Sequence, residues 1–98
     1  MSGKKMDIPK VIETLKELAD WLKGMECAER VNRIIAALED PRISSSELAR
    51  IKNQLSTKDL FNVRALGDIY VPDFVGDGTT YAWWNYLYRV AEICQENL

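Results

Sequence analysis

The last quarter of the chain reads Val75-Gly-Asp-Gly-Thr-Thr-Tyr-Ala-Trp-Trp-Asn-Tyr-Leu-Tyr-Arg-Val-Ala-Glu-Ile-Cys-Gln-Glu-Asn-Leu98 and contains five of the nine aromatic side chains. Asp77, Thr79 or Thr80 can cap a helix that then runs to about Glu96. At 100° per residue, its apolar positions gather within about 60° of Leu87, and further aromatic residues widen the apolar arc to roughly 240°. Because so wide an arc must be covered, we expect this helix to lie in the middle of an all-helical bundle.

Two amphipathic helices are predicted in the N-terminal half. The first begins with Asp7 as N-cap and Pro9 in its first turn, and Gly24 supplies a left-handed stop. The second ends at Asp40, because a residue before proline avoids the helical region. Their link is short, so they should form an antiparallel hairpin. The apolar positions are Ile8, Val11, Ile12, Leu15, Leu18, Ala19 and Leu22 in the first helix, and Cys27, Ala28, Val31, Ile34, Ile35 and Leu38 in the second.

A third helix is predicted from Ser44, which forms a capping box with Glu47, while Ile43 and Leu48 form a hydrophobic staple. Its apolar face is narrow, so we expect it on the outside of the bundle. Residues 56–66 are compatible with a short further helix that Gly67 ends.

Residues 68–78 contain glycines, a proline and bulky apolar groups, which indicates an ordered loop before the last helix. We therefore predict an all-α protein, a compact bundle of four to five helices with an apolar C-terminal helix at its centre. Residues 1–6 are expected to be a disordered tail, and residues 7–98 a single domain.

The charge of the chain is unevenly distributed. The net charge is −2, but residues 1–64 carry 12 Lys and Arg against 10 Asp and Glu, whereas residues 65–98 carry one Arg against five acids. An acidic end argues against nucleic acid as its partner, because phosphate binding needs a cationic face. It is suited to a basic protein partner.

The residue types present make catalysis and metal binding improbable. The chain has no His and two cysteines, Cys27 and Cys94, which lie on apolar helix faces and should be buried free thiols. We expect no catalytic residues, no metal and no cofactor. No apolar run reaches the roughly 18 residues of a membrane span, and the start lacks a signal peptide, so a cytoplasmic protein without membrane attachment is expected.

Residues 43–55 also suggest a helix-turn-helix that binds DNA, because Arg50, Lys52 and Asn53 lie on the outer side of the predicted helix. Against this alternative, Asp40 and Glu47 flank the segment, and the chain as a whole is acidic.

A short, acidic, all-helical chain with an aromatic and acidic C-terminal region resembles the small immunity proteins of bacterial toxin systems. The resemblance lies in size, charge and helical make-up over the whole chain. It implies a non-catalytic module that neutralises a basic toxin or nuclease by occluding its active surface. The residues expected to bind the partner are the acidic Asp68, Asp73 and Asp77, and the aromatic anchors Tyr70, Tyr81 and Trp21.

Two alternatives stay open at this stage. The chain could be a homodimeric adaptor, or a phage or regulatory assembly protein, in which the aromatic flank of the last helix pairs with its own copy about a twofold axis. Trp21 lies about 120° from the centre of the first helix's apolar stripe, so it either packs at the edge of the core or stands exposed as a contact residue.

Overall fold

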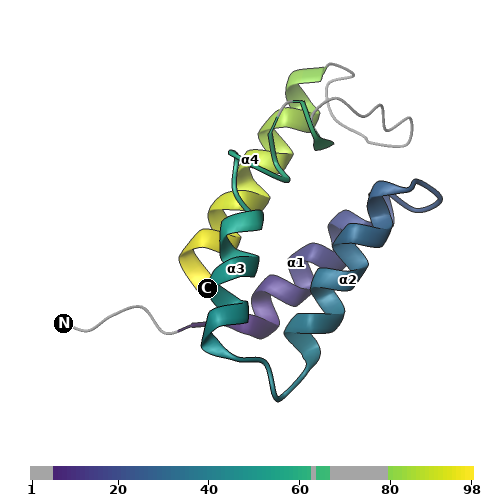
Figure 1. Cartoon of the computed structure of the whole chain (residues 1–98). Coiled ribbons are helices and arrows are strands. Elements are labelled where there is room, and N and C mark those ends of the chain that lie inside the picture. The colour runs from purple at the N-terminus through teal and green to yellow at the C-terminus, as the bar shows by residue number, and fades with distance from the viewer. Residues whose placement is uncertain (1–5, 63, 67–79) are drawn as a thin grey trace.

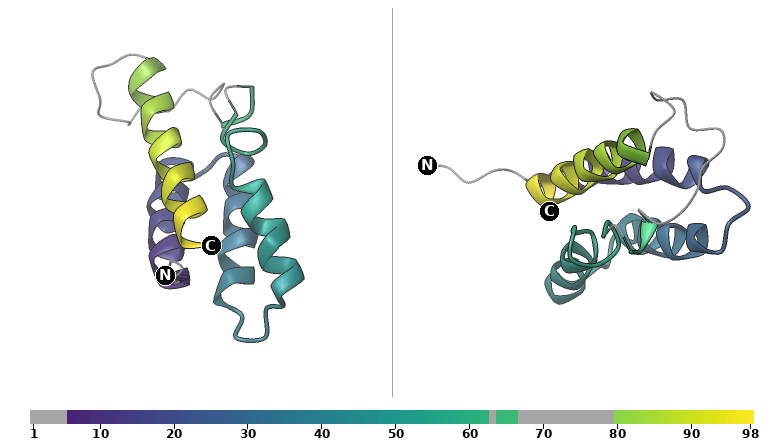
Figure 2. Two further views of the ribbon diagram at one scale, coloured as in Figure 1. Left: turned by 90° about the vertical axis from the view of Figure 1, so that its left-hand side faces the viewer. Right: turned by 90° about the horizontal axis from the view of Figure 1, so that it is seen from above.

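The computed structural model describes residues 6–62, 64–66 and 80–98, and of residues 80 and 81 it describes the backbone only. These residues form four α-helices, α1 (Ile8–Trp21), α2 (Cys27–Glu39), α3 (Ser45–Gln54) and α4 (Thr80–Asn97). The helices run alternately up and down, with α1 and α4 in one layer and α2 and α3 in the other (Figures 1 and 2). The predicted all-α bundle is confirmed, with four helices in the described part of the chain.

The ends of the N-terminal hairpin follow the signals in the sequence. Asp7 caps α1, because its Oδ1 accepts a hydrogen bond from the Lys10 backbone N–H at 3.1 Å. Gly24 follows α1 with φ +87°, a conformation that side-chain-bearing residues rarely adopt. Asp40 is extended, with φ −75° and ψ 119°, which ends α2 before Pro41.

The bundle is also closed at its termini. The Asp7 N–H donates to the Asn97 carbonyl at 2.9 Å, so the start of α1 is joined to the end of α4. This bond fixes the antiparallel register of the two helices.

The core of the described residues is entirely apolar. All four helices contribute to it, and so does the segment after α3. Burying one such Leu, Val or Phe side chain stabilises the fold by roughly 1.5–3 kcal/mol before the loss of chain entropy. The side chains with almost no exposure are Val11, Leu15, Leu18, Leu22, Val31, Leu55, Phe61, Leu66, Leu87, Val90 and Cys94.

α4 buries one stripe, and this stripe is narrower than the apolar arc in the sequence. It consists of Trp83, Leu87, Val90, Ala91 and Cys94, at the spacing of three and four residues that keeps one face of a helix inward. Other aromatic positions fall outside it: Trp84 and Tyr86 are partly buried, and Tyr88 is 46% exposed. Among the described residues, the closest helix packing is that of α1 on α2 and of α1 on α4. We expected the last helix to be the one that packs closely on two neighbours, but in the structure it is α1.

The described residues of the segment 56–66, which are 56–62 and 64–66, do not form the short α-helix that we considered. The described part of this segment is a series of turns, in which the Phe61 N–H bonds the Ser56 carbonyl and the Leu66 N–H bonds the Leu60 carbonyl. Side chains compete with a helical ladder, since Ser56 Oγ accepts from the Lys58 N–H and Asn62 Oδ1 accepts from the Arg64 N–H. The segment is still anchored, because Leu60, Phe61 and Leu66 are buried.

α3 lies on the outside, as its narrow apolar face predicted. Ser44 Oγ accepts from the Glu47 N–H at 3.1 Å and caps its first turn. At its other end, the Gln95 side-chain amide of α4 donates to the carbonyls of Lys52 and Leu55, at 2.7 and 2.6 Å. These are carbonyls that a helix end leaves without an intrahelical donor, so Gln95 fastens α3 to α4.

Candidate functional site

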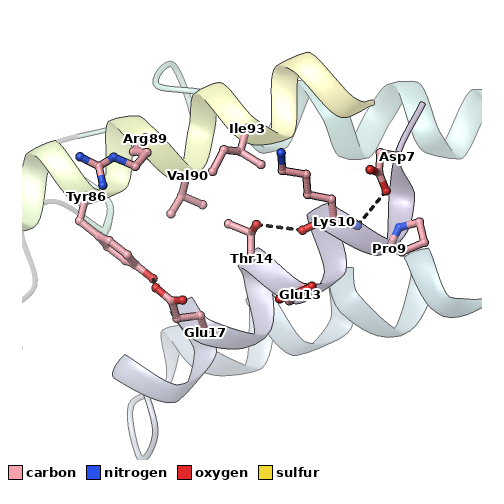
Figure 3. A pocket seen from close by; sticks show the side chains of 10 residues that line it. All are labelled: Asp7, Pro9, Lys10, Glu13, Thr14, Glu17, Tyr86, Arg89, Val90 and Ile93. Carbon is pink, nitrogen blue, oxygen red and sulfur yellow. Dashed lines mark hydrogen bonds between the residues drawn. The ribbon is translucent and has the colours of Figure 1, made fainter. Parts of the chain in front are cut away.

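A groove of about 700 Å³ runs between α1 and α4 (Figure 3). From α1 it is lined by Lys10, Thr14 and Glu17, and from α4 by Tyr86 and Arg89, among others. The lining contains two cations, Lys10 and Arg89, and three carboxylates, Asp7, Glu13 and Glu17. Lys10 and Arg89 make no ion pair with any described residue, so both remain available to an approaching molecule.

Tyr86 and Glu17 close one end of this groove (Figure 3). The Tyr86 hydroxyl donates to Glu17 Oε1 at 3.1 Å, and the Tyr86 ring stacks on Trp83 with a centroid separation of 5.6 Å. Burial raises the pKa of Tyr86, the hydrogen bond to Glu17 raises it further, and a hydrogen bond with the Trp21 side chain acts in the opposite direction. The phenol therefore stays protonated and holds one oxygen of Glu17 in place.

Trp83 continues this network to the segment after α3. Its Nε1–H donates to the Leu66 carbonyl at 2.8 Å, a buried hydrogen bond. Glu17, Tyr86, Trp83 and Leu66 thus join α1, α4 and the end of the turn segment through consecutive contacts.

A second hollow, of about 500 Å³, lies beyond Glu17 at the C-terminal end of α1. Its lining among the described residues is Glu17, Asp20, Trp21 and Lys23. Glu17, Asp20 and Trp21 are spaced three and four residues apart, which brings them to one side of the helix. We call these three residues, with Tyr86, the acidic–aromatic face.

The residues predicted to bind a partner fall into three groups. Trp21 is the last residue of α1 and is partly buried against the core, which confirms its position at the core edge. Tyr81 lies in the first turn of α4, but its side chain is outside what the structure describes. Four further candidates lie outside the described residues: Asp68, Tyr70, Asp73 and Asp77.

Two residues beside Trp21 on α1 were not predicted from the sequence. Glu17 and Asp20 were not singled out, because alternate polar positions on an amphipathic helix are usually just solvated. Asp20 and Trp21 follow Glu17 by three and four residues, and this spacing indicates from the sequence alone that they share one side of the helix. The contact between Glu17 and Tyr86 spans 69 residues and has no local signature.

Both cysteines are free thiols, as expected, although only Cys94 is fully buried. Burial raises the pKa of Cys94 to about 12, and burial is also the main reason that the pKa of Cys27 is raised. In the part of the chain that the structure describes, no group of three His, Cys, Asp or Glu residues could hold a metal ion. Nor does any helix there have the length and apolar character needed to cross a membrane.

Comparisons of the chain with protein-family models, with curated proteins and with solved structures found no match. The functional proposal therefore depends on the residues of the acidic–aromatic face and on the charge distribution of the chain.

Proposed function

We propose that this chain is a non-catalytic protein-binding module of the bacterial cytoplasm that neutralises a basic toxin or nuclease. Its mechanism is occlusion: the folded domain covers the cationic surface with which the toxin holds its substrate. The proposal unites the acidic C-terminal third of the sequence with an aromatic contact surface.

The observation that carries this proposal is the acidic–aromatic face. Glu17 and Asp20 are exposed carboxylates beside the partly buried Trp21, and Tyr86 is fixed to Glu17 by a hydrogen bond. Aromatic residues held in place by neighbouring contacts are typical energetic anchors of protein interfaces, since little side-chain entropy remains to be lost on binding. Carboxylates around such an anchor select a basic partner and speed its approach.

The sequence adds three further carboxylates, Asp68, Asp73 and Asp77, in a stretch without any cation. We propose that they meet Lys or Arg residues of the same partner, with Tyr70 and Tyr81 as additional aromatic contacts. Charge reversal at Asp73 and Asp77 should then slow association with a cationic partner and flatten its salt dependence.

A protection experiment tests the proposal. The open reading frame next to this one in its native genome is expressed with and without the chain, and growth and copurification are followed. The expected result is a neighbour that is toxic alone, harmless with this chain, and recovered in a complex with it. A harmless neighbour, or a toxic one that neither binds nor is neutralised, contradicts the proposal.

Variants show which face is used. Glu17→Lys with Asp20→Lys should abolish protection while the protein stays folded, since both side chains are exposed. Glu96→Lys, an exposed acid near the end of α4, is the matched control and should protect like the unaltered chain.

A second candidate function, self-association, is favoured by one observation on the opposite flank of α4. Tyr88 is 46% exposed and borders a hollow of about 610 Å³ with Lys58, Asp59 and Glu92. An exposed aromatic beside charges of both signs can pair with its own copy about a twofold axis. The measurement that separates the two functions is the solution mass on dilution: a persistent dimer that Tyr88→Ala dissociates favours the adaptor, and a monomer favours the inhibitor.

A further inference from the structure

A hollow of about 610 Å³ lies between α4 and the turn segment that follows α3. Tyr88 borders it from α4 and is 46% exposed, whereas the neighbouring Leu87 is buried. Among the described residues, Tyr88 and Met6 are the exposed large hydrophobic side chains. An exposed aromatic ring beside a hollow can enter an equal hollow on another molecule, as aromatic anchors do in protein interfaces.

The charges around this hollow leave one cation and one anion without a partner. Its described lining contains Lys58, Asp59 and Glu92. Asp59 is already paired, because its Oδ1 accepts from Arg30 Nη2 at 3.1 Å. Lys58 and Glu92 are exposed and form no ion pair with any described residue. Two free charges of opposite sign make the surface complementary to itself, whereas a partner surface of a single sign would oppose one of them with a like charge.

We infer that this surface pairs with a second copy of the chain about a twofold axis. In such an interface the same residues meet in both directions, so Lys58 of each copy contacts Glu92 of the other, and each Tyr88 ring enters the other hollow. The inference rests on the second candidate function, self-association, and names the residues that recognise each other. We call Lys58, Tyr88 and Glu92 the self-pairing surface.

This dimer is a weak one that dissociates on dilution. Its charge pairs are exposed to solvent, so each contributes little, and each copy supplies one aromatic anchor. Tyr88 is two residues from Tyr86 on α4, about 200° around the helix axis. Association through Tyr88 therefore leaves the acidic–aromatic face uncovered, and the dimer is compatible with the inhibitor function.

Reversal of the two free charges tests the pairing. Lys58→Glu and Glu92→Lys each replace two attractive contacts by two repulsive ones, since every contact occurs twice in a twofold dimer. Sedimentation equilibrium of the full chain at increasing concentration should show self-association weakened by at least about fivefold in each variant. Both side chains are exposed, so the variants should stay folded, which circular dichroism checks.

Two combinations should restore association. In an equimolar mixture of the two single variants, position 58 of one meets position 92 of the other with opposite charges at both contacts, so a mixed dimer should form. The double variant, Lys58→Glu with Glu92→Lys, has the net charge of the unaltered chain and should associate like it. Tyr88→Ala should weaken association in both combinations.

Glu96→Lys is the matched control for the change of charge. Glu96 is an exposed acid one turn beyond Glu92 on α4 and lies outside the described lining of the hollow. Its reversal should leave self-association unchanged. If it weakens association as much as Glu92→Lys does, the effect comes from net charge and the inference is overturned.

Three further results would overturn the inference. The first is the mass of a single chain at every concentration. The second is single variants that associate like the unaltered chain. The third is a mixture and a double variant that associate no better than the single variants, because a twofold pairing of these two positions requires both rescues.

These outcomes are separable from the fate of the inhibitor function. If the mass stays that of one chain but the chain still neutralises its neighbour, the self-pairing surface is wrong and the inhibitor function stands. If the mixed variants associate but the neighbour is harmless, the self-pairing surface stands and the inhibitor function fails.

Discussion

The Tyr86 hydroxyl of α4 donates a hydrogen bond to Glu17 Oε1 of α1 at 3.1 Å, and Glu17 lines both the groove between the two helices and the hollow at the C-terminal end of α1. The bond thus has a structural role, in joining two helices, and a functional one, in orienting a carboxylate of the acidic–aromatic face.

Tyr86→Phe removes this hydrogen bond and the one with the Trp21 side chain, while the ring can keep its stack on Trp83. The free energy of unfolding should fall by about 0.5–1.5 kcal/mol for each hydrogen bond lost, the usual net contribution. We expect the lower part of that range, because Glu17 is exposed. Urea unfolding followed by circular dichroism measures the change. Tyr88→Phe, on the exposed side of the same helix, is the control and should stay within about 0.5 kcal/mol of the unaltered protein.

A double-mutant cycle of Tyr86→Phe and Glu17→Ala isolates the pair. If the hydrogen bond is the reason for the loss, the two changes together should destabilise by less than the sum of their separate effects. Strict additivity would show that the loss in Tyr86→Phe comes from another contact of the hydroxyl, such as its hydrogen bond with the Trp21 side chain.

Alkaline pH should weaken the fold through Cys94 before any other described group with a raised pKa has a large effect. The pKa of Cys94 is about 12 in the folded protein because of burial, and about 8.5 in an unfolded chain. Since the folded pKa is the higher one, the unfolded state loses its proton first as pH rises. The stabilising contribution is therefore complete below about pH 8.5 and declines above it. Tyr86, whose pKa is also raised, should add to the decline above about pH 10.

The measurement is urea unfolding between pH 7 and pH 10 in the presence of a reductant. Cys94→Ala should be less stable at pH 7, because it leaves a small cavity, but its stability should change less between pH 8.5 and pH 10. Cys27→Ala is the matched control, since that thiol is only partly buried. A pH dependence that Cys94→Ala leaves intact would assign the alkaline loss to other groups.

The buried stripe of α4 can be tested with two adjacent residues. Leu87 is 1% exposed, so Leu87→Ala should destabilise by about 2–5 kcal/mol, the loss typical of a buried Leu. Tyr88 is 46% exposed, and Tyr88→Ala should cost well under half as much. Similar losses at both positions would mean that α4 is covered on both flanks, as the wide apolar arc in the sequence suggested.

The helices could be predicted where local signals agree with one another. Asp7, Gly24 and Pro41 set the ends of α1 and α2, and the apolar positions between them repeat at helical spacing, so local and tertiary preferences coincide. The turn segment was harder, because the hydrogen bonds of Ser56 and Asn62 compete with a helical ladder whose apolar residues would suit either form.

The candidate site was only partly predictable for a related reason. Trp21 stood out because an aromatic residue off the apolar stripe is unusual. Glu17 became a candidate only because the Tyr86 hydroxyl bonds to it, and Tyr86 reaches Glu17 only when α4 packs antiparallel on α1. A sequence pattern gives the face of one helix, whereas the partner of that face depends on register, which here is fixed by contacts between the two ends of the chain.

Gln95 provides the sharpest test of how α3 is held. Its side-chain amide donates to the carbonyls of Lys52 and Leu55, so Gln95→Glu replaces a donor with a carboxylate that faces two carbonyl oxygens. The free energy of unfolding should fall by about 1–3 kcal/mol, because two helix-end carbonyls lose their partner and a charge meets them instead. Glu92→Gln reverses the charge change on the exposed side of α4 and should have an effect below about 0.5 kcal/mol. Hydrogen exchange locates the loss: the amides of α3 should lose more protection than those of the α1–α2 hairpin, because Gln95 contacts α3 directly. A uniform loss of protection over all helices would instead mean that α3 and the hairpin unfold as a single unit, and that Gln95 stabilises the whole bundle.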